Sequence, residues 1–212
     1  HTRTRRQRQM CIRDRSDRVV WLLEELALPY QLEWFERSES GLAPQEYRDL
    51  HPVGTAPIIS DGDTVLAEST AIVEYISQRH GNGKLSVSVD APNYADYLYW
   101  MQFNSNVQAM FFAKMALSKL DAEHSDNFTA GVIQRREDAY YSHLSQRLGE
   151  CDYLAGDEFS CADIMSFFNL ATLPLFGARS IETLPNVPEY VERISSRPAY
   201  ICLLYTSDAA DE

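Results

Sequence analysis

The sequence is poor in the residues that build metal centres and disulfide scaffolds. It has four cysteines and five histidines in 212 residues. No two cysteines have Cys-x-x-Cys spacing, and the histidines are scattered without clusters of carboxylates around them. We therefore expect neither structural zinc nor a disulfide framework, and a reducing, cytoplasmic location. The cysteines are Cys11, Cys151, Cys161 and Cys202.

Long apolar runs and basic residues are also scarce. The longest apolar stretch, Ile164 to Ala178, is interrupted by Ser166, Asn169 and Pro174. It is too short to cross a bilayer and predicts a buried helix instead. Lysine and arginine number 19 against 31 acidic residues, a formal net charge of −12. Because an acidic body repels phosphates, we expect neither a nucleic-acid nor a membrane partner.

Residues 1–15 depart from this acidic composition, with six arginines and one acid, Asp14. A transit peptide or a nucleic-acid-binding arm would suit that charge. The segment lacks the serines and the apolar face of a transit peptide. The acidic rest of the chain disfavours a nucleic-acid-binding arm. Residues 1–15 and the tail at 205–212 resemble translated sequencing-adapter read-through. We therefore expect both to be foreign segments joined to a fragment.

The apolar content, 45%, is sufficient for one large or two small domains. Periodicity predicts a helix from Val19 to Leu26 and a strand over 31–35. Strands at 56–59 and 65–67 flank an Asp61-Gly62-Asp63 turn, and a helix follows from Ser69 to about Arg79. With a strand before the first helix, this order matches a thioredoxin-like α/β domain over 16–80. Residues 5–15, where that strand would lie, are mostly arginine and glutamine.

The second half is predicted to be all-helical. Residues 81–92 have the composition of a linker. Helical periodicity then recurs with no strand between the segments, which predicts an all-α domain over 93–204. The expected helices are 94–119, 130–148, 161–173 and 187–195.

Four blocks carry a family resemblance, and they are Trp21-Leu22-Leu23-Glu24-Glu25-Leu26; His51-Pro52-Val53-Gly54-Thr55-Ala56-Pro57 with Glu68-Ser69-Thr70-Ala71-Ile72; Phe159-Ser160-Cys161-Ala162-Asp163-Ile164; and Leu184-Pro185-Asn186-Val187-Pro188 with Arg197-Pro198-Ala199. Each block is weak by itself. Together, in order and in register over 15–204, they resemble the cytosolic glutathione S-transferases, and specifically their serine-type bacterial branch.

The resemblance implies a glutathione-binding half-site made by Thr55, Ala56, Pro57, Glu68 and Ser69. Ala56 would pair through its backbone with the cysteinyl part of glutathione, before a cis Pro57. The Ser69 hydroxyl and N–H would hold the γ-glutamyl carboxylate, and Glu68 would orient the amino group. The alternative for Glu68 and Ser69 is a pair that only caps the following helix.

The family reaction is attack of the glutathione thiolate on an apolar electrophile, as in detoxification. A hydroxyl at the start of the first helix stabilises the thiolate, and the branch has the pattern Ser-Arg-x-x-Arg-x-x-Trp-Leu-Leu. Here Asp14 stands in the place of that serine, followed by Arg15, and Ser16 is the nearest hydroxyl or a helix cap. We therefore expect glutathione binding with impaired conjugation. The alternatives are a glutathione-dependent thiol reductase using Cys11 and a catalytically silent interaction module.

Three further predictions concern the second domain and the assembly. Ser160 and Asp163 have the spacing of a structural capping box. The resemblance implies that Tyr97, Met101 and Asn104 form the wall that binds the electrophile, against the alternative of core packing. It also implies a homodimer, with glutathione as co-substrate and no metal.

Overall fold

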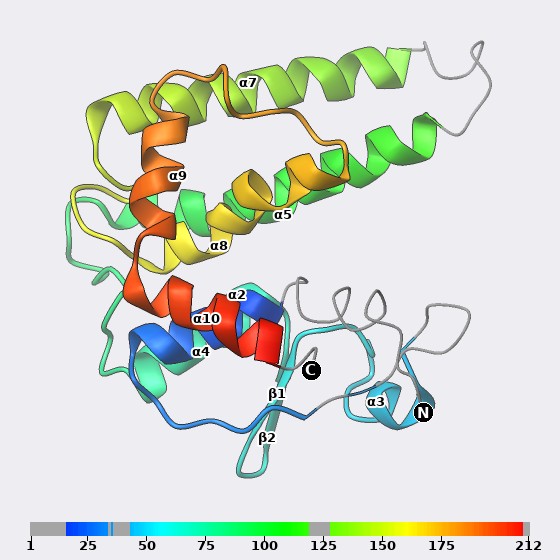
Figure 1. Ribbon diagram of the computed structural model, residues 1–212, viewed down its shortest axis with the longest axis vertical. Coiled ribbons are helices and arrows are strands. Elements are labelled where there is room, and N and C mark those ends of the chain that lie inside the picture. Colours follow the sequence, from blue (N-terminus) through cyan, green and yellow to red (C-terminus); the bar gives the residue numbers. More distant parts are fainter. Residues whose placement is uncertain (1–15, 34, 36–42, 119–127, 210–212) are drawn as a thin grey trace. The chain divides into compact units, whose positions relative to one another are not determined.

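The computed structural model describes residues 16–33, 35, 43–118 and 128–209 (Figure 1). They form two compact units. The first contains the described residues up to 86 together with those from 195 onward, and the second contains the described residues of 87–194.

The first unit is built on a β-hairpin and two packed helices. Strands β1 (Ile58–Asp61) and β2 (Thr64–Ala67) are antiparallel, with Ile58 opposite Ala67 and Asp61 opposite Thr64. Gly62, with φ of 59°, supplies the left-handed conformation in the turn. The remaining elements of this unit are α2 (Ser16–Glu25), α3 (Gln45–Arg48), α4 (Ser69–Arg79) and α10 (Pro198–Ala209).

The core of the first unit lies between α2 and α4, which pack against each other. Trp21 and Leu22 from α2 and Ile72 and Val73 from α4 are almost fully buried. In α4, Ile76 follows Ile72 and Val73 by four and three residues, so this helix presents one apolar face to α2.

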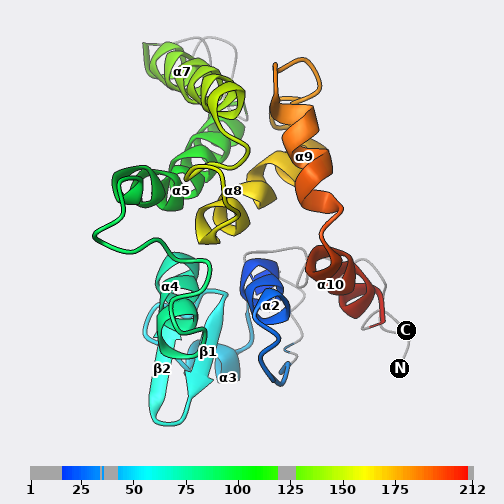
Figure 2. The ribbon, with the colours of Figure 1, turned by 90° about the vertical axis from the view of Figure 1, so that its left-hand side faces the viewer.

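The second unit consists of helices packed around α8 (Cys161–Ala171), most of whose side chains are buried. Figures 1 and 2 both show α8 beside α5 (Tyr94–Leu117), and α5 also packs on α7 (Phe128–Glu150). The Ser166 hydroxyl of α8 donates to the Trp100 carbonyl of α5 at 3.2 Å. Short η1 (Leu173–Phe176) and α9 (Val187–Ser195) complete the unit.

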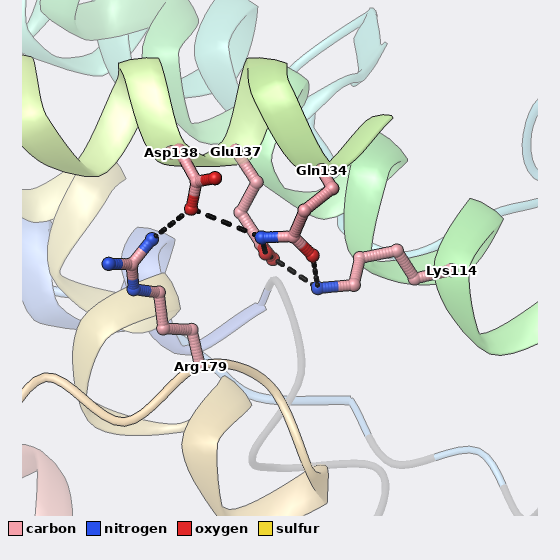
Figure 3. A network of polar contacts seen from close by, with 5 residues as sticks. All are labelled: Lys114, Gln134, Glu137, Asp138 and Arg179. Carbon is pink, nitrogen blue, oxygen red and sulfur yellow. Dashed lines mark hydrogen bonds and ion pairs between the residues drawn. The ribbon is translucent and has the colours of Figure 1, made fainter. Parts of the chain in front are cut away.

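A polar network ties α5, α7 and the segment after η1 together (Figure 3). Lys114 on α5 contacts Glu137 at 2.5 Å and Gln134 at 3.1 Å, both on α7. The next residue of α7, Asp138, accepts a hydrogen bond from Arg179 at 2.7 Å. Since every member has its partner within this unit, the network serves to hold the helices together.

Most predicted elements are present, with one exception. The helices predicted over 69–79 and 187–195 match α4 and α9, and the apolar stretch from Ile164 is a buried helix followed by η1. None of the helices in the described part of the chain is long and apolar enough to span a membrane. The strand predicted over 31–35 is absent from its described residues. A strand needs a neighbour to pair with, and among the described residues β1 and β2 pair only with each other.

The second predicted domain, 93–204, differs from the second unit at both ends. The structure divides the chain after residue 86, which lies inside the predicted linker at 81–92, and the chain returns to the first unit at 195. The cause is α10, which packs on α2 through Tyr200 against Trp21, with ring centroids 5.0 Å apart. Helix α10 continues to Ala209, into the tail predicted to be foreign. The foreign origin of that tail stays a prediction, and residues 1–15 lie outside the described residues.

Candidate functional site

The register of the hairpin brings the two halves of the predicted site to one end of it. Ile58 pairs with Ala67, so Pro57 and Glu68 lie just beyond that pair, at the end opposite the turn. Residues paired across antiparallel strands are about 5 Å apart. The Ala56-Pro57 segment and the start of α4 are therefore neighbours in space.

The peptide bond between Ala56 and Pro57 is cis, as the sequence predicts. At this end of the hairpin, Pro57 is buried, Ala56 is half-buried and Thr55 is exposed. Among the described residues, no hydrogen bond engages the backbone N–H or C=O of Ala56. This backbone therefore has both a donor and an acceptor to offer to a ligand.

Ser69 is the first residue of α4 and is only 6% exposed. The residue at the N-cap is Glu68, and no side chain caps the helix. The alternative interpretation of Ser69 as a capping serine is thus not supported, because its hydroxyl is turned to another partner. The start of α4 also presents backbone N–H groups that have no acceptor within the helix.

Glu68 has φ of 71° and ψ of 111°, a conformation that an L-residue with a side chain rarely adopts. Its side chain is exposed. Backbone conformations of this kind cost free energy and persist where the surrounding structure imposes them, often at functional sites.

The partner of Ser69 is Arg18, a residue of α2 that sequence reasoning did not include in the site. Its Nη1 lies 3.5 Å from the Ser69 Oγ, and the arginine is 1% exposed. A signal was present, because Arg18 precedes Trp21 and Leu22 by three and four residues and so lies on their apolar helix face. An arginine at a buried helical position calls for a polar partner.

The catalytic predictions fall largely outside the described residues. Asp14, Arg15 and Cys11 lie there, and their roles stay predictions. Ser16 is described: it is the first residue of α2 and is half-buried. It is therefore at a helix N-terminus, as a thiolate-stabilising hydroxyl requires.

The predicted electrophile wall lies on α5, where its three residues are buried. Tyr97, Met101 and Asn104 are 2%, 3% and 1% exposed. The backbone carbonyl of Asn104 accepts a hydrogen bond from the Asn169 side chain of α8 at 3.0 Å, and Tyr97 stacks on Tyr94. These contacts fit the packing alternative, and the wall stays a prediction.

The capping box at the start of α8 is confirmed. The Ser160 N–H donates to Asp163 Oδ2 at 2.9 Å, while Asp163 Oδ1 accepts from the Leu154 N–H and the Tyr190 hydroxyl. Burial raises the pKa of the Asp163 carboxyl, and the hydrogen bonds it accepts oppose this rise. Its role is to fix the start of a buried helix. Within the described ranges, no group of three or more His, Cys, Asp or Glu residues could hold a metal ion.

Two family models match this chain. Residues 15–79 match the glutathione S-transferase N-terminal domain, and residues 110–198 match the glutathione S-transferase C-terminal domain. Together they cover more than half of the sequence. The chain belongs to the glutathione S-transferase family.

Two curated relatives are similar over most of their length. Glutathione S-transferase 3 of Schizosaccharomyces pombe is 27% identical over 201 residues, which cover 87% of this chain and 81% of the relative. Glutathione S-transferase GstB of Escherichia coli is 26% identical, with 86% of this chain and 88% of that protein covered. Both alignments span the two domains of the family.

Solved structures agree on the fold. A glutathione S-transferase from Actinobacillus pleuropneumoniae superposes with a TM-score of 0.81 at 29% identity, covering 92% of this chain and 89% of that one. A sphingomonad glutathione S-transferase complexed with glutathione gives a TM-score of 0.70 at 19% identity, covering 92% and 96%. Residues 15–79 of the first unit are thus the thioredoxin-like domain of the family, and residues 110–198 belong to its helical domain.

Proposed function

We propose that the protein binds glutathione at the open end of its hairpin and transfers the glutathione thiolate to an apolar electrophile. Family membership assigns the reaction. The observation that carries the proposal is the convergence of the Ala56 backbone, Ser69 and Arg18 at the start of α4. Glutathione is a peptide with a carboxylate at its γ-glutamyl end. The Ala56 backbone is a partner for the peptide, and the start of α4 is a partner for the carboxylate.

Ala56 supplies the peptide-binding part of the site. An extended peptide binds to an exposed backbone edge through paired N–H and C=O groups. Ala56 has both groups available and the exposed Thr55 beside it. The cysteinyl residue of glutathione is the part that pairs here, which places its sulfur between the two ends of the ligand.

Ser69 and Glu68 supply the recognition of the γ-glutamyl group. The N-terminus of α4 attracts an anion through its backbone N–H groups and the helix dipole, and the Ser69 hydroxyl adds a donor. The Glu68 carboxylate accepts from the γ-glutamyl amino group. The conformation of the Glu68 backbone is consistent with a ligand-binding position.

Residues at the start of α2 promote formation of the glutathione thiolate. A thiol has a pKa near 8.5 and is mostly protonated at neutral pH, so a donor to the sulfur anion is required. Ser16 is the candidate donor, and Asp14 occupies the position of the family serine. A carboxylate there raises the thiol pKa by like-charge repulsion, and Arg15 offsets part of this effect.

The proposal extends to the residues that bind the electrophile and to the pairing of two copies of the chain. Tyr97, Met101 and Asn104 bind the electrophile. A second copy of the chain pairs with α5, where Leu98 and Phe112 are 47% and 50% exposed on one side of the helix. The protein acts in the cytoplasm.

The proposal is tested on the full chain and its Asp14→Ser variant. Both are expected to be retained on immobilised glutathione. At saturating glutathione, the variant is expected to conjugate a chloronitroarene at least about tenfold faster, the factor of one pKa unit. Retention without conjugation in either protein would favour the interaction module. Loss of activity on alkylation of Cys11, with thiol reduction in place of conjugation, would favour the reductase.

A further inference from the structure

Arg18 is the one charged residue among the side chains that the structure describes as almost fully buried in α2. Its neighbours Val19, Val20, Trp21 and Leu22 are also buried. Removing a guanidinium from water is unfavourable unless polar groups receive its N–H donors. One such group is the Ser69 hydroxyl, on a different helix and 51 residues away in sequence.

We propose that Arg18 is a positioning residue of the glutathione site, which orients the Ser69 hydroxyl toward the γ-glutamyl carboxylate and adds positive charge behind it. The inference rests on the proposed function. It adds a residue of α2 to a site whose other carboxylate-binding groups come from α4.

The hydrogen-bonding capacity of the two side chains sets the direction of this contact. A guanidinium only donates, so the Ser69 Oγ must act as the acceptor at 3.5 Å. A serine hydroxyl has one proton, which then remains available for a second acceptor. A carboxylate at the N-terminus of α4 is such an acceptor, and a chain of donors ending on an anion is strengthened along its length.

Charge adds to this orientation. The N-terminus of α4 carries the positive end of the helix dipole, and Arg18 places a full positive charge next to its first residue. Because Arg18 is buried, solvent screens this charge less than it screens a surface charge. Lysine would retain the charge but lose the planar set of donors that defines the contact with Ser69.

A double-mutant cycle separates positioning from packing. The variants are Arg18→Lys, Ser69→Ala and the double variant, and Arg79→Lys, at an exposed arginine at the far end of α4, is the control. Glutathione affinity is measured by calorimetry and folding by thermal denaturation. Arg18→Lys is expected to weaken binding about tenfold when Ser69 is present and less than about threefold when Ser69 is alanine. Arg79→Lys is expected to leave affinity unchanged.

Different results would overturn the positioning role of Arg18 and the proposed function. An equal loss in both backgrounds, or no loss, would overturn the positioning role while leaving the proposed function standing. Absence of binding by the unmodified chain would overturn the proposed function itself. If Arg18→Lys does not fold, NMR spectra of the unmodified protein test the positioning role instead. The Arg18 side-chain N–H resonances are expected to shift with glutathione but not with cysteinylglycine, and equal behaviour with both ligands would contradict the inference.

Discussion

At the residue scale, Glu68 has the most unusual backbone of the candidate site. With φ of 71°, its backbone is held in the left-handed region, which glycine adopts more readily than a residue with a Cβ. Glu68→Gly is therefore expected to raise the free energy of unfolding by about 1 kcal/mol in urea titrations. The same change is expected to weaken glutathione binding, because the carboxylate that meets the amino group is lost.

Glu68→Gln is the matched control for this prediction. It keeps the Cβ and the backbone conformation, so its stability is expected to stay within about 0.5 kcal/mol of the unmodified chain. Its glutathione affinity is expected to fall as in the glycine variant. A destabilised glycine variant would show that the Glu68 backbone is not strained, and unchanged affinity in both variants would remove Glu68 from the site.

At the scale of elements, Asp61 ties the end of β1 to α4. Its Oδ2 lies 2.7 Å from the Tyr75 hydroxyl and 2.7 Å from His80 Nε2. Hydrogen bonds from Tyr75 and His80 lower the pKa of the Asp61 carboxyl from its usual 3.8. A lowered folded-state pKa means that the stabilisation is present above pH 3.8 and is lost as the pH falls through the folded value.

The pH dependence of this tie is measurable by comparison with Asp61→Asn. The unmodified chain is expected to be more stable than the variant at about pH 6, and the difference is expected to shrink as the pH falls below about 3.8. Urea unfolding at a series of pH values gives both quantities. A difference that stays constant or grows at low pH would mean that the charge of Asp61 does not stabilise the folded state.

A second, less exposed carboxylate joins α2 to Arg197, the residue directly before α10. Glu25 accepts hydrogen bonds from Arg197 Nε at 2.7 Å, from Arg197 Nη2 at 2.8 Å and from Trp21 Nε1 at 3.0 Å. Its side chain is 9% exposed. The two-point contact joins two of the sequence blocks that carry the family resemblance, although they are 172 residues apart.

Arg197→Lys is expected to lower the free energy of unfolding by about 1–2 kcal/mol, because lysine cannot reproduce the two parallel hydrogen bonds to Glu25. Chemical denaturation of the variant provides the measurement. Arg79→Lys serves as a control for the loss of an exposed guanidinium and is expected to change stability by less than about 0.5 kcal/mol. Equal effects of the two substitutions would indicate that α10 does not depend on this contact.

At the scale of the whole molecule, local patterns predict the elements well. The limits of α4 and α9 follow from apolar periodicity, and the start of α8 follows from the Ser160 and Asp163 capping box. The Ala56-Pro57 and Glu68-Ser69 pairs could be recognised through the family resemblance, and the register of the short hairpin that joins them brings them together.

Contacts between distant residues could not be predicted in this way. Periodicity shows that Arg18 lies on an apolar helix face, but nothing in the pattern indicates that it meets Ser69. The membership of α10 in the first unit depends on Arg197 and Tyr200 meeting α2, which no local pattern reports. The strand expected over 31–35 was wrong for its described residues, since alternation alone supplies no pairing partner.

The central claim is that this chain binds glutathione at the start of α4, and calorimetric titration of Ser69→Ala tests it most directly. The control is Ser60→Ala, at an exposed serine of β1 near the turn end of the hairpin. The unmodified chain and the control are expected to bind glutathione equally. Ser69→Ala is expected to bind at least about tenfold more weakly, because a hydrogen bond to a charged group contributes about 1.5–3 kcal/mol. No binding by the unmodified chain, or unchanged affinity in a folded Ser69→Ala protein, would contradict the account.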